Sequence, residues 1–152
     1  MYIVFFRSAP YPLFGTFDVP DFQTTCTRRA RSNTPLQALN ISNDPAFIEF
    51  AQGLALRTIQ KIPGEADKTL DERIRLAFKL ALSRAPTDRE FKTLINYAIE
   101  FAKDISTKDG GEDTKSLISE AIIKSGIPLN QGAALVAASR AILNTDNFIT
   151  RE

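Results

Sequence analysis

The sequence predicts an all-α fold, an irregular bundle of five or six helices with an extended aromatic N-terminal arm. Three observations lead to this prediction. From Thr34 onward, helix start signals recur, each a capping residue followed by proline or, three residues later, by glutamate. The apolar residues after these signals recur at three- and four-residue spacing, which is typical of one face of a helix. The first part of the chain is instead irregular and rich in proline and phenylalanine.

The arm spans residues 1–33 and is predicted to belong to the same single domain as the helical part, residues 34–152. Pro10, Pro12 and Pro20 argue against a helix in the arm. Its apolar anchors are the phenylalanines Phe5, Phe6, Phe14, Phe17 and Phe22. An aromatic extended segment needs a surface to lie against. We expect the arm to wrap its own helical body, with docking on a partner as the alternative.

Two helices with proline at the first position follow the arm. Thr34 is expected to cap a short helix that begins at Pro35 and runs through Leu39. Asp44 and Pro45 repeat this arrangement and open a longer helix that continues to about residue 61.

Two capping boxes predict the next two helices. Thr69 with Glu72 is expected to open the first, and Thr87 with Glu90 the second. The apolar face of the first consists of Leu70, Ile74, Phe78, Ala81 and Leu82. The apolar face of the second consists of Phe91, Leu94, Ile95, Ala98, Phe101 and Ala102.

The last part of the chain predicts two more helices after a polar, glycine-containing link at 106–113. The first covers about 114–125, and the second follows Pro128 and covers about 129–143. Residues 133–138 are apolar nearly all round the helix, which places this helix in the middle of the bundle.

Composition excludes several kinds of chemistry. The 152 residues include nineteen basic and eighteen acidic ones, no histidine, and Cys26 as the one cysteine. A Ser-His-Asp or Cys-His nucleophile, a Cys/His zinc site and histidine-ligated haem therefore cannot be built from this chain alone. A net charge of +1 gives no general attraction to nucleic acid. No apolar run is long enough to span a membrane.

Arg28, Arg29 and Arg31 form the one basic cluster of the sequence. Guanidinium groups suit carboxylate, sulfate or phosphate, so an anion site is one interpretation. The interpretation we favour is pairing with nearby carboxylates. The candidates are Asp18, Asp21, Asp44 and Glu49. Three arginines are too small an electrostatic footprint to predict nucleic-acid binding.

Arg140 lies at the end of the most apolar helix, where an unpaired charge would be costly. We expect a structural ion pair with a carboxylate, for which Asp44, Glu49 and Asp146 are candidates, or contacts with backbone carbonyls. Thr34 and Asp44 are interpreted as ordinary helix caps. No catalytic residue and no metal ligand is assigned.

Several motifs together carry a family resemblance. They are Phe17-Asp18-x-Pro20-Asp21, Cys26-x-x-Arg29-x-Arg31, Asn33-Thr34-Pro35-Leu36-Gln37-Ala38-Leu39, Asn43-Asp44-Pro45, Arg73-Ile74-x-x-Ala77-Phe78, Ala81-Leu82-Ser83-Arg84 and the ending from Ser139-Arg140 to Phe148-Ile149. With them the chain resembles the planctomycete-type C-terminal domain of unknown function, the PSD-one domain of large secreted proteins that often contain cytochrome c.

The resemblance implies that the chain is a C-terminal fragment of a larger exported protein, periplasmic or extracellular. It implies no cofactor in this chain, with haem possible in a separate module of the parent. Tyr11 stands between two prolines where the family often has histidine, which speaks against a histidine-dependent role there. The resemblance supplies no catalytic residues.

We therefore expect a non-catalytic structural or interaction module that completes a larger exported protein. Its partner would be the rest of that protein, or another chain, contacted through the aromatic arm. Two alternatives stay open. One is binding of an acidic or sulfated glycan through the arginine cluster. The other is a part of a polysaccharide-degrading or extracytoplasmic electron-transfer enzyme whose active site lies mostly outside this chain.

Overall fold

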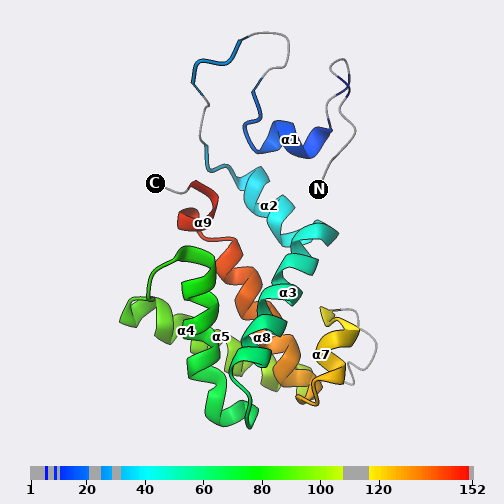
Figure 1. Ribbon diagram of the computed structural model, residues 1–152, viewed down its shortest axis with the longest axis vertical. Coiled ribbons are helices and arrows are strands. Elements are labelled where there is room, and N and C mark those ends of the chain that lie inside the picture. Colours follow the sequence, from blue (N-terminus) through cyan, green and yellow to red (C-terminus); the bar gives the residue numbers. More distant parts are fainter. Residues whose placement is uncertain are drawn as a thin grey trace.

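The computed structural model describes residues 6, 9, 11–20, 25–28, 32–107 and 117–150, with the backbone alone at 66–68 and 107. These residues contain eight helices and no strand (Figure 1). The five longer helices are α2 (Pro35–Asn43), α3 (Pro45–Lys61), α4 (Ala66–Leu82), α5 (Asp88–Thr107) and α8 (Leu129–Leu143). The short ones are α1 (Pro12–Thr16), α7 (Glu120–Lys124) and α9 (Asp146–Thr150). The predicted all-α bundle with an N-terminal arm is confirmed.

Helix α8 is the centre of the bundle, as its composition predicts. It packs against α3, α4 and α5, which surround it in Figure 1. Every residue from 132 to 139 is buried. The small side chains in this stretch let the neighbouring helices approach closely. The core residues facing α8 include Ala51, Ala55, Ile59, Ile74, Phe78 and Ala98.

Helices α2 and α3 begin where the sequence predicts. Thr34 is the N-cap of α2 and Asp44 the N-cap of α3, each with proline in the following position. Helix α2 is longer than expected, because it continues past Leu39 to Asn43 before Asp44 turns the chain into α3.

The start of α4 corrects one prediction. The helix begins at Ala66 with Glu65 as its N-cap, so Thr69 and Glu72 do not form a capping box. Thr69 already lies inside the first turn, where its Oγ1 donates to the Glu65 carbonyl oxygen at 2.9 Å. A threonine hydroxyl inside a helix can donate to the carbonyl oxygen four residues earlier without ending the helix.

The start of α5 confirms the second capping box. The Thr87 backbone N–H donates to Glu90 Oε2 at 2.7 Å, and the Glu90 N–H donates to Thr87 Oγ1 at 3.3 Å. The apolar residues predicted for this helix all pack on the core. Arg84 reaches the same carboxylate from the α4–α5 connection, with Nη2 2.7 Å from Oε1 and Nη1 3.0 Å from Oε2.

Two further differences concern short helices. The arm contains α1, because Pro12 occupies a first helical position, where its missing N–H costs nothing. The single helix expected at 114–125 is wrong. Ser119 has an extended backbone and is the N-cap of α7, and the preceding Ile118 is anchored in the core. Residues 108–116, which include the expected start, lie outside the described residues.

Candidate functional site

A buried polar contact around Gln37 holds the arm against α2. The Gln37 side chain is 1% exposed. Its Nε2 donates to the Thr16 carbonyl oxygen at 2.8 Å and to Ser32 Oγ at 3.1 Å. Its Oε1 accepts from the Thr34 N–H at 3.0 Å, while Thr34 Oγ1 accepts from the Gln37 N–H at 3.3 Å. Gln37 thus closes a capping box on α2 and also binds the arm.

Asp18 organises the arm side of this contact. Its Oδ2 accepts from both the N–H and the hydroxyl of Ser32 at 2.7 Å, and from Gln37 Nε2 at 3.4 Å. The backbone of Asp18 has a φ of 55°, in the left-handed region that aspartate tolerates better than most residues. Charge-assisted hydrogen bonds of this kind stabilise such a conformation.

The predicted basic cluster is described only at Arg28, which is exposed. Arg29, Arg31 and Asp21 lie outside the described residues. The anion and glycan site therefore stays a prediction. Of the proposed carboxylate partners, Asp44 accepts from the Ala46 N–H at 2.9 Å as the cap of α3, and Glu49 is exposed on the same helix.

Arg140 contacts a backbone carbonyl, one of the two kinds of partner expected for it. Its Nη2 donates to the carbonyl oxygen of Ser42 in the last turn of α2. A cation at a helix C-terminus interacts favourably with the helix dipole. Asn144, one turn further along the chain, donates from Nδ2 to Ser42 Oγ at 3.0 Å and to the Ala38 carbonyl oxygen at 3.3 Å. These contacts join the C-terminal end of α8 to α2.

Asp146, a candidate ion-pair partner of Arg140, instead contacts the segment that leads into α2. Its Oδ1 accepts from Asn33 Nδ2 at 2.6 Å. Since Asp146 is the first residue of α9, this contact connects the end of the chain to the residue just before the α2 cap.

Large apolar side chains are exposed on α2 and in the first half of α3, the helices next to the arm (Figure 1). Leu36 and Leu39 on α2 are 56% and 58% exposed, and Phe50 on α3 is 54% exposed. Leu36 and Leu39 share one face of α2, because they are three residues apart. The Phe50 ring contacts that of Phe47, which in turn contacts Phe17 of the arm, with centroids 5.8 and 5.7 Å apart. We call Leu36, Leu39 and Phe50 the α2–α3 apolar surface.

A second feature lies at the other end of the bundle, where α3 turns into α4. Arg73, on α4, is 2% exposed. Its Nε and Nη2 donate to the Ile62 carbonyl oxygen at 3.1 and 2.8 Å, and Nη2 also reaches the Gly64 carbonyl oxygen at 3.2 Å. Burial lowers the pKa of the Arg73 guanidinium below its ordinary value, although arginine keeps its charge in proteins.

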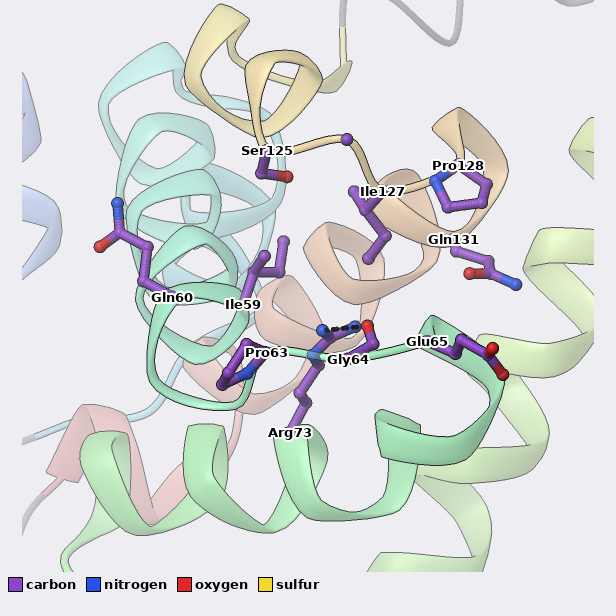
Figure 2. A pocket seen from close by; sticks show the side chains of 11 residues that line it. Ile59, Gln60, Pro63, Gly64, Glu65, Arg73, Ser125, Ile127, Pro128 and Gln131 are labelled. Atoms are coloured by element: carbon purple, nitrogen blue, oxygen red, sulfur yellow. Dashed lines mark hydrogen bonds between the residues drawn. The ribbon is translucent and has the colours of Figure 1, made fainter.

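Arg73 lines a cavity of about 550 Å³ between the α3–α4 connection and the α7–α8 connection. Figure 2 shows its side chain rising from α4 to the α3–α4 connection, with the guanidinium beside the Gly64 carbonyl. The other lining residues are Ile59, Gln60, Pro63, Gly64, Glu65, Ser125, Gly126, Ile127, Pro128 and Gln131.

Neither Gln37 nor Arg73 was predicted from the sequence as a functional or organising residue. A signal for Gln37 was present, because Thr34 and Gln37 have the spacing of a capping box. A weaker signal existed for Arg73, which lies four residues before Ala77 and next to Ile74, at the edge of the apolar face.

No group of three or more Asp, Glu, Cys or His side chains in the described part of the chain could hold a metal ion. Among the helices described, none combines the length and the apolar character that crossing a bilayer requires.

The comparisons with known proteins identify a family. The model of the PSD1 family, described as a protein of unknown function (DUF1553), matches residues 1–98, the arm and the helices through the first half of α5. The family resemblance drawn from the motifs is thereby confirmed. No curated protein and no solved structure matches the chain.

Proposed function

The chain belongs to this PSD1 family of proteins of unknown function, and on that premise we propose that it is a non-catalytic interaction module that completes a larger exported protein. The partner is the remainder of that protein, or another chain of the same assembly. This partner binds to the arm end of the bundle, on the α2–α3 apolar surface of this chain.

The observation that carries this proposal is the concentration of exposed apolar side chains at one end. Nine large hydrophobic residues in the described part of the chain are exposed, and five of them lie in the arm, α2 or α3. These five are Phe6, Tyr11, Leu36, Leu39 and Phe50. Single exposed hydrophobic residues are normal, but a group of them favours a protein interface.

The non-catalytic part of the proposal rests on composition. The chain has no imidazole to act as a general base near neutral pH. The Glu90 carboxyl, whose pKa is lowered, is engaged by Arg84 and Thr87 at the start of α5, where it belongs to the capping box.

The test begins with the genomic sequence directly upstream of Met1, which gives the first candidate partner. That polypeptide is produced together with this chain, and co-purification and the Kd of the separated parts are measured. We expect the Leu36→Ser, Leu39→Ser, Phe50→Ser variant to lose at least tenfold in affinity, because central apolar side chains contribute most of the energy of an interface.

A matched control changes three exposed residues on another helix. Lys92→Ser, Asn96→Ser and Glu100→Ser alter the surface of α5 and leave the net charge unchanged. This control variant should bind like the wild type. If the apolar variant also binds like the wild type, or if the upstream polypeptide does not bind at all, the proposed interaction module is wrong.

A further inference from the structure

The buried guanidinium of Arg73 has no acidic partner among the residues that the structure describes. Its three hydrogen bonds to described residues go to backbone carbonyls, those of Ile62 and Gly64. Nη1 is buried and has no hydrogen-bond partner among the described residues. The C-terminal end of α3, at Ile62, compensates part of the charge through its dipole. A buried charge with an unused donor is costly unless something else pairs with it.

Arg73 lines the cavity, and the other walls of the cavity are largely apolar. Ile59, Pro63, Ile127 and Pro128 supply the apolar surface. Apart from Arg73, the one charged residue of the lining is Glu65. Figure 2 shows its carboxylate directed away from the Arg73 guanidinium. A concave apolar pocket with one well-placed polar group is the usual form of a small-molecule site.

We propose that this cavity binds a monoanionic organic carboxylate with a short apolar body. The carboxylate accepts from Arg73 Nη1, and the apolar body lies against Ile59 and Ile127. This binding goes beyond the proposed interaction function and uses the opposite end of the bundle, away from the arm (Figure 1).

The charges of the lining select this class of ligand. One guanidinium matches one negative charge, so a dianion such as sulfate or phosphate would leave one charge uncompensated in the cavity. The apolar walls favour a hydrocarbon body over a fully hydrated inorganic ion. Nη1 is itself covered, so a ligand can reach it only if part of the cavity wall is displaced. Binding should therefore also change the NMR chemical shifts of residues in the wall.

The experiment is a titration of the whole chain followed by 15N NMR, with hexanoate as the probe. The Arg73 Nε–H should be visible, because it is buried and hydrogen-bonded to the Ile62 carbonyl oxygen. We expect saturable shifts of this signal and of the amides of Ile59 and Ile127. A Kd on the order of 1 mM is what a ligand of this size reaches.

Two further probes test the chemistry. Hexan-1-ol has the same apolar body without the charge, and sulfate is a dianion without the apolar body. Both should bind at least tenfold more weakly than hexanoate. Equal shifts with hexan-1-ol would mean that Arg73 does not recognise the ligand, and equal shifts with sulfate would mean that the site does not select a monoanion. Either result overturns the proposal, as does an absence of shifts at 50 times the expected Kd, about 50 mM hexanoate.

Variants locate the ligand without disturbing Arg73. Gln60→Trp places a large side chain at an exposed position of the cavity wall and should reduce hexanoate affinity at least fivefold. Asn96→Trp makes the same kind of change at an exposed position on α5 that does not line the cavity, and it should bind like the wild type. If both variants bind hexanoate equally well, the ligand lies elsewhere and the proposal is wrong.

Discussion

Polar residues with few or no charged partners carry the most specific contacts of this protein. Gln37 is an amide on a helix start, and Arg73 is a guanidinium on a helix face, yet both are almost fully buried and both donate to backbone carbonyls. Removing one partner of a buried hydrogen bond costs more than the bond itself contributes, because the other group stays desolvated. Substitutions at these positions should therefore show how much of the stability comes from tertiary hydrogen bonds and how much from local helix preferences.

Gln37→Glu tests whether the tertiary contact outweighs the capping preference. Glutamate suits this position of a capping box as well as glutamine does. Here it removes the donors to the Thr16 carbonyl and places a negative charge close to Asp18 Oδ2, which lies 3.4 Å from Gln37 Nε2. We expect the free energy of unfolding at pH 7 to fall by about 2–3 kcal/mol in urea titrations. A Thr34→Ser control should keep its stability. An unchanged Gln37→Glu variant would contradict this account of the arm contact.

Glu90 makes the stability of the folded protein depend on pH in the acidic range. Hydrogen bonds from Arg84, and secondarily from Thr87, lower the pKa of the Glu90 carboxyl from 4.5 to about 2. Since the folded pKa is the lower one, the stabilisation is present above about pH 4.5 and is lost as the pH falls toward 2. The effect is small, because both side chains are more than a third exposed.

Between pH 5 and pH 2, the Glu90→Gln variant should therefore lose less stability than the wild type, as measured by the urea concentration at the midpoint of unfolding. Glutamine keeps the capping box but does not titrate. Glu100→Gln, a change on the exposed side of the same helix, serves as the control. Parallel pH curves for wild type and Glu90→Gln would show that the Arg84 contact does not persist in solution.

At the scale of the helix, capping residues determine where a helix begins. The packing around a position determines how much a substitution there changes the free energy of unfolding. Gly53 and Gly132 illustrate this, since each lies inside a long helix where glycine is unfavourable. A Cβ at Gly53 would meet nothing within 4 Å. A Cβ at Gly132 would lie 3.0 Å from Ile122 Cγ2 and 3.4 Å from Ile127 Cγ2, where α8 approaches α7.

The same substitution should then have opposite effects at these two positions. Gly53→Ala should raise the free energy of unfolding by roughly 0.5–1 kcal/mol, through helix propensity alone. Gly132→Ala should lower it by about 1 kcal/mol, because overpacking exceeds that gain. Urea denaturation of the two variants measures both effects. A stabilised Gly132→Ala variant would mean that α7 can move away from α8 at little cost.

At the scale of the whole molecule, the bundle is organised around α8 and the arm is an addition to one end of it (Figure 1). In the first part of the arm, Thr16, Phe17 and Asp18 contact α2 and α3. The core around α8 contains none of these residues. The bundle should therefore fold without the arm, but with additional apolar surface exposed.

Deletion of residues 1–22 tests this division. We expect helical circular dichroism to be retained, the Tm to fall, and the shortened chain to associate in a concentration-dependent way in sedimentation experiments, since Phe47 loses its contact with Phe17. Adding Leu36→Ser, Leu39→Ser and Phe50→Ser to the deletion should suppress the association. A deletion variant that stays monodisperse and binds nothing new would contradict docking at this end of the molecule.

The sequence by itself determined the helical class, the starts of α2, α3, α5 and α8, and the central place of α8, because caps and apolar periodicity act within a few residues of one another. Only the tertiary structure decided what the buried polar groups contact. Gln37 meets Thr16 from 21 residues away, and Asn144 meets Ser42 from 102 residues away. Arg73 is buried because the α3–α4 connection folds over it. Such partners depend on how helices pack in space, which local spacing does not specify.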